Sequence, residues 1–162
     1  MLLDTNALLP WGDGFYTLAR THHSVFAALP AHVHEAVVRA VVRSASVRPE
    51  GLGSEWEEVL VAPWVGSAAK QESFVRQIAQ AEDGDVGEMV EGGLYGGVRC
   101  GVRVVWGEGD SWIPRGKVEG LCGLLGGRLE RPLVVVEGAG HLVMLDQPGR
   151  VEEEVRSWLG EV

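Results

Sequence analysis

The stretch Val102-Arg103-Val104-Val105-Trp106-Gly107 decides the fold. Its β-branched and aromatic residues favour a strand that ends at the glycine. A second apolar run, Leu133-Val134-Val135-Val136, follows about 25 residues later. Runs that are apolar throughout suit strands buried on both faces, as in a parallel sheet. We therefore expect two adjacent parallel strands, with residues 2–5 pairing beside the first.

Helical patterns surround these two strands. Residues 117–125 can form a helix between them, and the apolar residues after Pro148 recur at the spacing of an amphipathic helix. Units of strand, helix and strand join parallel strands by right-handed crossovers. Residues 98–162 thus predict an α/β architecture with a short parallel sheet.

The rest of the chain differs from residues 98–162 in its pattern of apolar residues and turn signals. Residues 31–97 are mainly helical in pattern, with expected helices at 32–46, 55–61 and 70–82. The glycine-rich stretch 83–97 indicates a loop or a weak helix. Residues 1–30 are apolar with turn signals, so we divide the chain into the regions 1–30, 31–97 and 98–162.

Composition and charge limit the possible partners. The 162 residues suit one domain, and 23 Asp and Glu against 14 Lys and Arg give a net charge of -9. Such a charge repels nucleic acid and anionic membranes, so we expect neither as a partner. The opening residues lack the basic segment of a signal peptide, and the sequence holds no long apolar run. We therefore expect a cytoplasmic protein.

Metal and cofactor motifs are missing from the sequence. Cys100 and Cys122 fit neither a disulfide framework nor a metal motif. His32 and His34 are two residues apart, so they point to different sides of a helix. The phosphate-binding and dinucleotide-binding glycine motifs are absent as well. We expect no metal and no cofactor.

Two polar side chains follow the predicted strands, and they are the candidate catalytic residues. Asp110 lies in the loop after the first strand, and His141 lies in the loop after the second. Because parallel strands present their carboxyl ends at the same edge, these side chains can come within hydrogen-bond reach. Gly138 and Gly140 permit a tight turn that aims the histidine over the sheet. Taken singly, the aspartate could be a turn residue and the histidine structural.

Together these segments resemble the C-terminal part of an α/β hydrolase. The resemblance rests on residues 104–114, on residues 137–143 and on Asp146-Gln147-Pro148, which matches the acid-x-proline start of the family's final helix. In that family the first loop carries the triad acid and the second the triad histidine, which implies these roles for Asp110 and His141. Residues 2–5 look like the sixth strand, and residues 8–12, 63–64 and 71–80 look like a helical cap. The resemblance implies a partial α/β-hydrolase fold with a short parallel sheet and a helical cap.

The nucleophile of the family is missing from this sequence. Its serine stands in Gly-x-Ser-x-Gly, before the acid and the histidine. All eight serines of this chain lack that context. The resemblance thus implies a serine-type hydrolase acting on an ester or similar small acyl substrate, here without the nucleophile and the oxyanion hole.

Three functions stay open at this point. The chain could be a hydrolase portion with a small-molecule substrate, completed by an N-terminal half or by self-association. It could be a non-catalytic module that binds a small apolar ligand, or an inactive truncated product. Several aromatic residues could line an apolar pocket under the cap or simply pack in the core, namely Trp11, Phe15, Trp56, Trp64, Phe74 and Tyr95.

Overall fold

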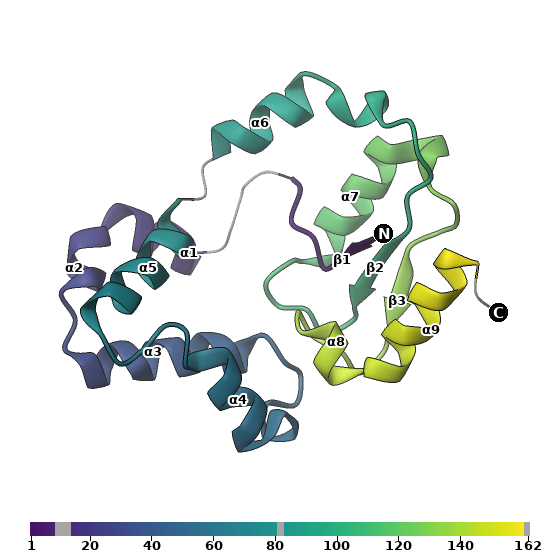
Figure 1. Cartoon of the computed structure of the whole chain (residues 1–162). Helices are drawn as coiled ribbons and strands as arrows, with labels where there is room; N and C mark the ends of the chain where they lie inside the picture. Colours follow the sequence, from purple (N-terminus) through teal and green to yellow (C-terminus); the bar gives the residue numbers. More distant parts are fainter. Residues whose placement is uncertain (9–13, 81–82, 161–162) are drawn as a thin grey trace.

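The centre of the molecule is a parallel sheet of three strands (Figure 1). The structure is a computed structural model that describes residues 1–8, 14–80 and 83–160. The strands are β1 (Leu2–Leu3), β2 (Val104–Gly107) and β3 (Val134–Val136), in that spatial order. Both pairs are parallel, with β1 paired to β2 and β2 paired to β3. The predicted strands and their pairing are confirmed, although each strand is shorter or shifted by one residue or more.

Both faces of the sheet are covered by helices, as the apolar strands predicted. Successive side chains of β2 point to opposite faces. Val104 and Trp106 join one core cluster with α7 (Arg115–Leu125), and Val105 joins the other with α9 (Pro148–Leu159). The short α8 (Val143–Asp146) leads into α9. The helices expected between the strands and after Pro148 are confirmed.

A second group of helices packs around its own core, and we call residues 14–79 the helical group. Figure 1 shows it to one side of the sheet. Its members are α1 (Gly14–Thr21), α2 (His23–Ala27), α3 (Ala31–Ser44), α4 (Gly53–Val61) and α5 (Ala68–Ala79). Its core consists of the buried residues Ala19, Val38, Val61, Phe74, Val75 and Ile78. The helices expected near residues 32–46, 55–61 and 70–82 are confirmed, with small shifts of their ends.

The helices α1 and α2 went unpredicted, because their turn signals hid their short apolar faces. They are stabilised by contacts with α5 rather than by their own periodicity. One side chain of α5 completes the end of α2: Gln71 Nε2 donates to the carbonyl oxygens of Phe26, Ala27 and Leu29, at 3.0–3.1 Å. Tertiary contacts thus determine this local structure.

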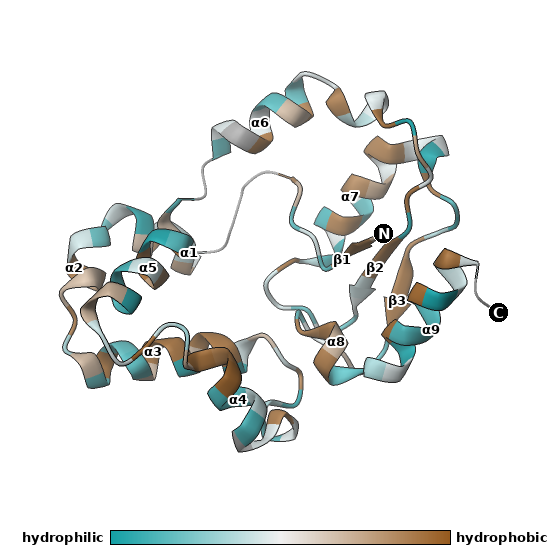
Figure 2. Ribbon diagram, in the orientation of Figure 1, coloured by the Kyte–Doolittle hydropathy of each residue, from teal (hydrophilic) through white to brown (hydrophobic). Residues whose placement is uncertain are grey.

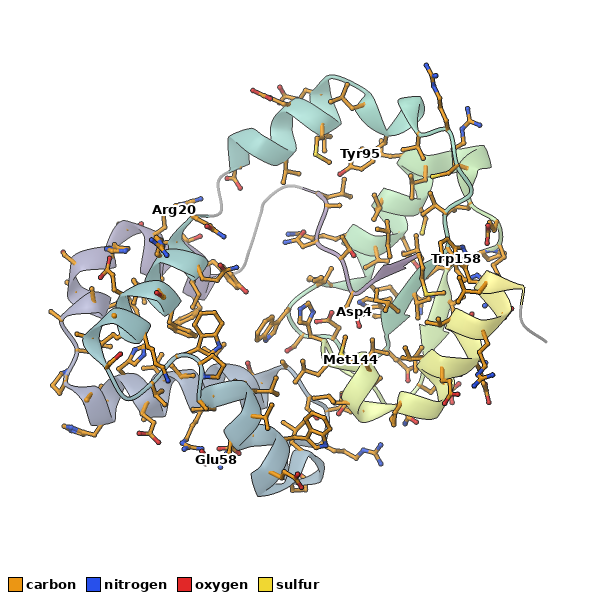
Figure 3. The ribbon with its side chains drawn as sticks, in the orientation of Figure 1. Asp4, Arg20, Glu58, Tyr95, Met144 and Trp158 are labelled. Carbon is orange, nitrogen blue, oxygen red and sulfur yellow. The ribbon has the colours of Figure 1, made fainter. Side chains whose placement is uncertain are left out.

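The glycine-rich stretch forms a helix, which was one of the two structures expected for it. The helix is α6 (Asp83–Glu91), followed by a 3-10 turn at Leu94–Gly97. Tyr95 anchors this turn, because its hydroxyl donates to the carbonyl oxygen of Ala7 at 2.6 Å (Figure 3). Further 3-10 turns lie at Pro49–Leu52 and Gly126–Arg128.

Apolar residues concentrate in the strands, in α7 and along parts of α3 and α4, while most other helices alternate between polar and apolar residues (Figure 2). Within the described ranges, every helix is too short or too polar to cross a membrane.

Candidate functional site

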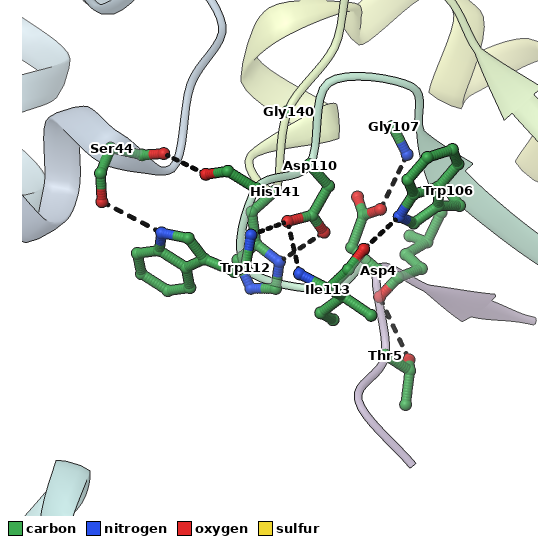
Figure 4. A network of polar contacts seen from close by, with 12 residues as sticks. Asp4, Thr5, Ser44, Trp106, Gly107, Asp110, Trp112, Ile113, Gly140 and His141 are labelled. Atoms are coloured by element: carbon green, nitrogen blue, oxygen red, sulfur yellow. Dashed lines mark hydrogen bonds and ion pairs between the residues drawn. The ribbon is translucent and has the colours of Figure 1, made fainter. Parts of the chain in front are cut away.

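Asp110 and His141 meet at the carboxyl edge of the sheet. Asp110 follows β2 and His141 follows β3, and Nδ1 of His141 lies 3.0 Å from Oδ2 of Asp110 (Figure 4). The aspartate side chain is fully buried, whereas the histidine side chain keeps 27% of its surface exposed. The prediction that these two side chains lie within hydrogen-bond reach is confirmed.

Backbone donors hold the Asp110 carboxylate from its other side. Its Oδ1 accepts the N–H groups of Trp112 at 2.8 Å and of Ile113 at 3.0 Å. The amide of Asp110 itself donates to the carbonyl oxygen of Gly107 at 3.0 Å, which closes a tight turn after β2. Two backbone donors thus converge on Oδ1 of one buried carboxylate, which fixes the direction in which its Oδ2 meets the histidine.

Trp112 connects the histidine to the helical group. Its ring stacks on the His141 ring, with centroids 4.7 Å apart and planes 27° apart. Its indole N–H donates to Oγ of Ser44, at the end of α3, at 3.0 Å. Tyr16 of α1 meets the same indole edge to face, with centroids 6.4 Å apart. No role was predicted for Trp112, because nothing in the sequence pattern shows what a tryptophan in a loop will contact.

Asp146 ties the histidine loop to the segment that follows α3. Its Oδ2 accepts the N–H of Gly140 at 2.7 Å, and its Oδ1 accepts the hydroxyl of Ser46 at 2.5 Å. The N–H of Leu142 donates to the carbonyl oxygen of Ala45 at 2.9 Å. Asp146, the acid of the Asp-x-Pro motif, therefore links the two regions through Ser46 and Gly140, and we call these contacts the clamp. The motif alone did not predict this role.

Glycines allow these loops to approach closely. A Cβ atom on Gly107 would lie 2.3 Å from the carbonyl oxygen of Gly140, and one on Gly140 would lie 2.8 Å from that of Ala45. Gly138 adopts φ +66°, which favours glycine. The expected tight turn before His141 is present, and Gly140 is needed for space rather than for its φ angle.

Asp4 is a third acid beside the pair, and sequence reasoning missed it. It directly follows β1, is 7% exposed, and accepts the N–H of Gly107 on Oδ1 at 2.8 Å. Burial raises the pKa of Asp4 to about 7, the Gly107 hydrogen bond opposes this rise, and the charge of Asp110 adds to it. The sequence signal that could have revealed this residue is an acidic side chain directly after the apolar residues of β1.

Comparisons with known proteins identify the fold. A crystal structure of an α/β hydrolase fold protein from Burkholderia ambifaria superposes with a TM-score of 0.77 and 30% identity, over 95% of this chain and 54% of that one. The chain therefore has a partial α/β-hydrolase fold. A thermophilic esterase from Thermogutta terrifontis, with malate bound, superposes with a TM-score of 0.67 and 18% identity, over 99% of this chain and 54% of the esterase.

A third α/β-hydrolase neighbour is E-2-(acetamidomethylene)succinate hydrolase, with a TM-score of 0.52 and 15% identity, over 94% of this chain and 55% of that one. The chain therefore spans about half the length of these hydrolases. No protein-family model and no curated protein matches it. The partial α/β-hydrolase fold predicted from the sequence is confirmed.

An apolar cavity of about 330 Å³ lies beside the pair in this α/β-hydrolase fold. Among the aromatic residues proposed for a pocket, Phe15 lines it, whereas Trp64, Phe74 and Tyr95 pack in the cores. Trp56 is exposed, and Trp11 lies outside the described residues. The cavity is lined by Phe15, Tyr16, Val37, Ala40, Val41, Ser44 and Trp112. Because Trp112 also stacks on His141, this cavity is next to the candidate catalytic pair.

A larger cavity, of about 580 Å³, lies on the α3 and α4 side of the helical group. Its lining includes Arg39 and Arg43, which already pair with Glu57 at 3.0 and 2.8 Å. The charges of these two arginines are thus already paired within the helical group.

The structure assigns His34 of α3 a place in the core of the helical group. His34 is buried and its Nε2 lies 3.0 Å from the carbonyl oxygen of Trp64, so it serves the helical core. The part of the chain that the structure describes holds no group of three or more potential metal ligands.

Proposed function

We propose that this chain supplies the acid and the histidine of a serine-hydrolase-type site that acts on an ester or a similar small acyl substrate. The observation that carries this proposal is the 3.0 Å contact between His141 Nδ1 and the buried Asp110 carboxylate. The esterase and hydrolase neighbours support it.

In the proposed mechanism, the Asp110 carboxylate accepts a hydrogen bond from the Nδ1–H group of His141. This hydrogen bond fixes the tautomer, so that Nε2 has its lone pair available as a base. Nε2 removes the proton of the nucleophilic hydroxyl as that oxygen attacks the acyl carbon. His141 then passes the same proton to the leaving alcohol, while Asp110 stabilises the intervening imidazolium.

The nucleophile has to come from a second polypeptide segment. The serines closest to the pair are engaged elsewhere: Ser44 accepts from Trp112, Ser46 donates to Asp146, and Ser111 contacts the carbonyl oxygen of Ser44. We propose that a segment packed beside β1 provides the serine and the oxyanion-hole donors. A preceding half of the same protein or a separate partner chain would both fill this role.

The proposed substrate is a small molecule with an apolar acyl part. The 330 Å³ cavity is lined by aromatic and aliphatic side chains, with Ser44 and Tyr16 as polar members. Residues 31–97 would act as the cap over this pocket. We place the activity in the cytoplasm without a nucleic-acid or membrane partner, since the net charge of -9 opposes both.

A second candidate function is a non-catalytic module that binds a small apolar ligand. The cavity favours it, because pockets of this size and lining hold ligands without any reaction. In that case His141 would matter only as a stacking partner of Trp112.

A chimera tests the proposal. The portion of the Burkholderia ambifaria protein that this chain does not cover is fused ahead of residue 1, and hydrolysis of an aryl ester is measured. We expect turnover that is lost in the His141→Ala chimera, and no such turnover from the 162-residue chain alone. A chimera that is monomeric and cooperatively folded, yet inactive, would contradict the proposal and favour the binding module.

A further inference from the structure

Asp4 is linked to the candidate acid through the backbone of a single residue, Gly107. Its Oδ1 accepts the N–H of Gly107 at 2.8 Å, and the carbonyl oxygen of Gly107 accepts the N–H of Asp110 at 3.0 Å. The N–H end of Gly107 is thus held by the Asp4 carboxylate (Figure 4), and its carbonyl end by the backbone amide of Asp110. Asp4 therefore contacts the first residue of the turn that carries Asp110.

The backbone of Asp4 is held in an uncommon conformation. Its φ is +40°, and it is the one residue other than glycine with a positive φ in the described ranges. Such a conformation persists only where the surrounding structure enforces it, and it is frequent at functional sites. Here it turns the chain at the end of β1, so that the carboxyl group faces β2 instead of solvent.

The second oxygen of Asp4 is buried without a hydrogen-bond partner among the described residues. An ionised carboxylate with one unpaired buried oxygen is costly, and a proton on that oxygen removes much of the cost. Other charges face the same group from each neighbouring loop: Asp110 after β2, and His141 and Asp146 after β3. The two further carboxylates disfavour ionisation of Asp4, while a protonated His141 favours it.

We propose that Asp4 is a positioning residue of this site, which holds the N–H of Gly107 and thereby sets how Asp110 meets His141. This inference rests on the proposed function for its catalytic meaning. The contacts themselves involve Asp4, Gly107, Asp110, Asp146 and His141 and hold without that function. Because burial raises the pKa of Asp4 to about 7, this residue gains its negative charge near neutral pH. Ionised Asp4 binds the N–H of Gly107 more tightly and adds a negative charge beside Asp110 and His141. The contact between Asp110 and His141 should therefore change with pH.

The amide proton of Gly107 reports this directly in nuclear magnetic resonance spectra of the full chain. We expect its chemical shift to follow a titration with a midpoint near 7. In Asp4→Asn this step disappears, while the amide keeps an acceptor. The control Glu137→Gln removes an exposed charge from the histidine loop and leaves the step unchanged. A step absent from the parent chain, or retained in Asp4→Asn, would overturn the proposal.

A second measurement tests positioning. The Nδ1 proton of His141 should exchange with solvent about tenfold faster in Asp4→Ala, and nearly as in the parent chain in Asp4→Asn. Equal exchange in all three proteins would show that Asp4 does not position the pair. Should Asp4→Ala not fold, Asp4→Ser serves in its place, because it also removes the acceptor carboxyl group.

These results are separable from the proposed function. If the chimera described above lacks esterase activity but the Gly107 step and the exchange difference are observed, the proposed function fails and the role of Asp4 in holding the pair stands. If the chimera is active, Asp4→Ala should lower kcat with little change in KM, since Asp4 does not touch the pocket. An unchanged kcat would overturn the positioning role.

Discussion

The sheet region and the helical group are built differently. In the sheet region, apolar cores lie on both faces of β2, and the loops after the strands are hydrogen-bonded to one another. In the helical group, one core lies between five helices. The N–H of Gly109 donates to Ala139 at 2.8 Å, and that of Glu108 donates to Val136 at 3.0 Å. Asp110 and His141 belong to the sheet region, whereas most of the residues that line the pocket belong to the helical group. The geometry of the catalytic candidates and the shape of the pocket therefore depend on separate parts of the chain.

The largest expected effect comes from emptying the core of the helical group. Phe74 is 7% exposed and packs its ring against Trp64 and His34, at 5.7 and 5.4 Å. Phe74→Ala should cost about 3–5 kcal/mol. Amide hydrogen exchange should then rise in α3 and α5 much more than in β2. The control Leu124→Ala, which truncates an exposed side chain of α7, should cost little. Equal loss of protection in both regions would show that they unfold as one unit.

A smaller effect is expected from crowding the two catalytic loops. Gly107→Ala places a Cβ atom against the Gly140 carbonyl, so the histidine loop has to move, at about 1–3 kcal/mol. The His141 and Asp110 contact should be lost with little change in the helical group. Gly116→Ala, in α7 with open space around it, is the matched control and should stabilise slightly. Urea unfolding and the His141 Nδ1 proton signal measure both outcomes.

The pH dependence of stability should depend on Asp4. Its folded pKa of about 7 lies above its ordinary value of 3.8, so the folded state holds this proton more tightly than the unfolded chain. Its contribution is therefore fully present below about pH 4 and is lost as the pH rises through 7. Relative to Asp4→Asn, the parent chain should lose about 1–2 kcal/mol between pH 5 and pH 8. Parallel stability curves for the two proteins would contradict this.

The smallest effect is expected at the clamp between the two regions. Ser46→Ala removes the hydrogen bond to Asp146 and the acceptor of the Arg48 N–H, at about 0.5–1.5 kcal/mol. Hydrogen exchange should increase in residues 45–48 and at Gly140 before it increases in either core. Ser157→Ala, at an exposed site in α9, should leave these amides unchanged. If Ser46→Ala does the same, the clamp does not join the regions.

The sequence predicted what periodicity and strand ends encode. Apolar runs predicted β2 and β3, and the loops after them predicted that Asp110 and His141 would meet. Contacts between distant segments were not predictable in this way: Trp112 stacking on His141 and Asp146 binding the turn after α3 depend on how the helical group packs. Asp4 was hidden because an acid at a strand end usually reaches solvent, and its burial follows from the neighbouring loops.

The most direct test of the central claim is a double-mutant comparison of Asp110→Ala and His141→Ala in the active chimera. If the two residues act as one unit, the double variant should lose about as much kcat as His141→Ala alone, a loss on the order of 10⁴–10⁶-fold. Aryl ester hydrolysis under saturating substrate gives all four values. Losses that multiply in the double variant would show that the two residues act independently, and would contradict the claim that Asp110 works through His141.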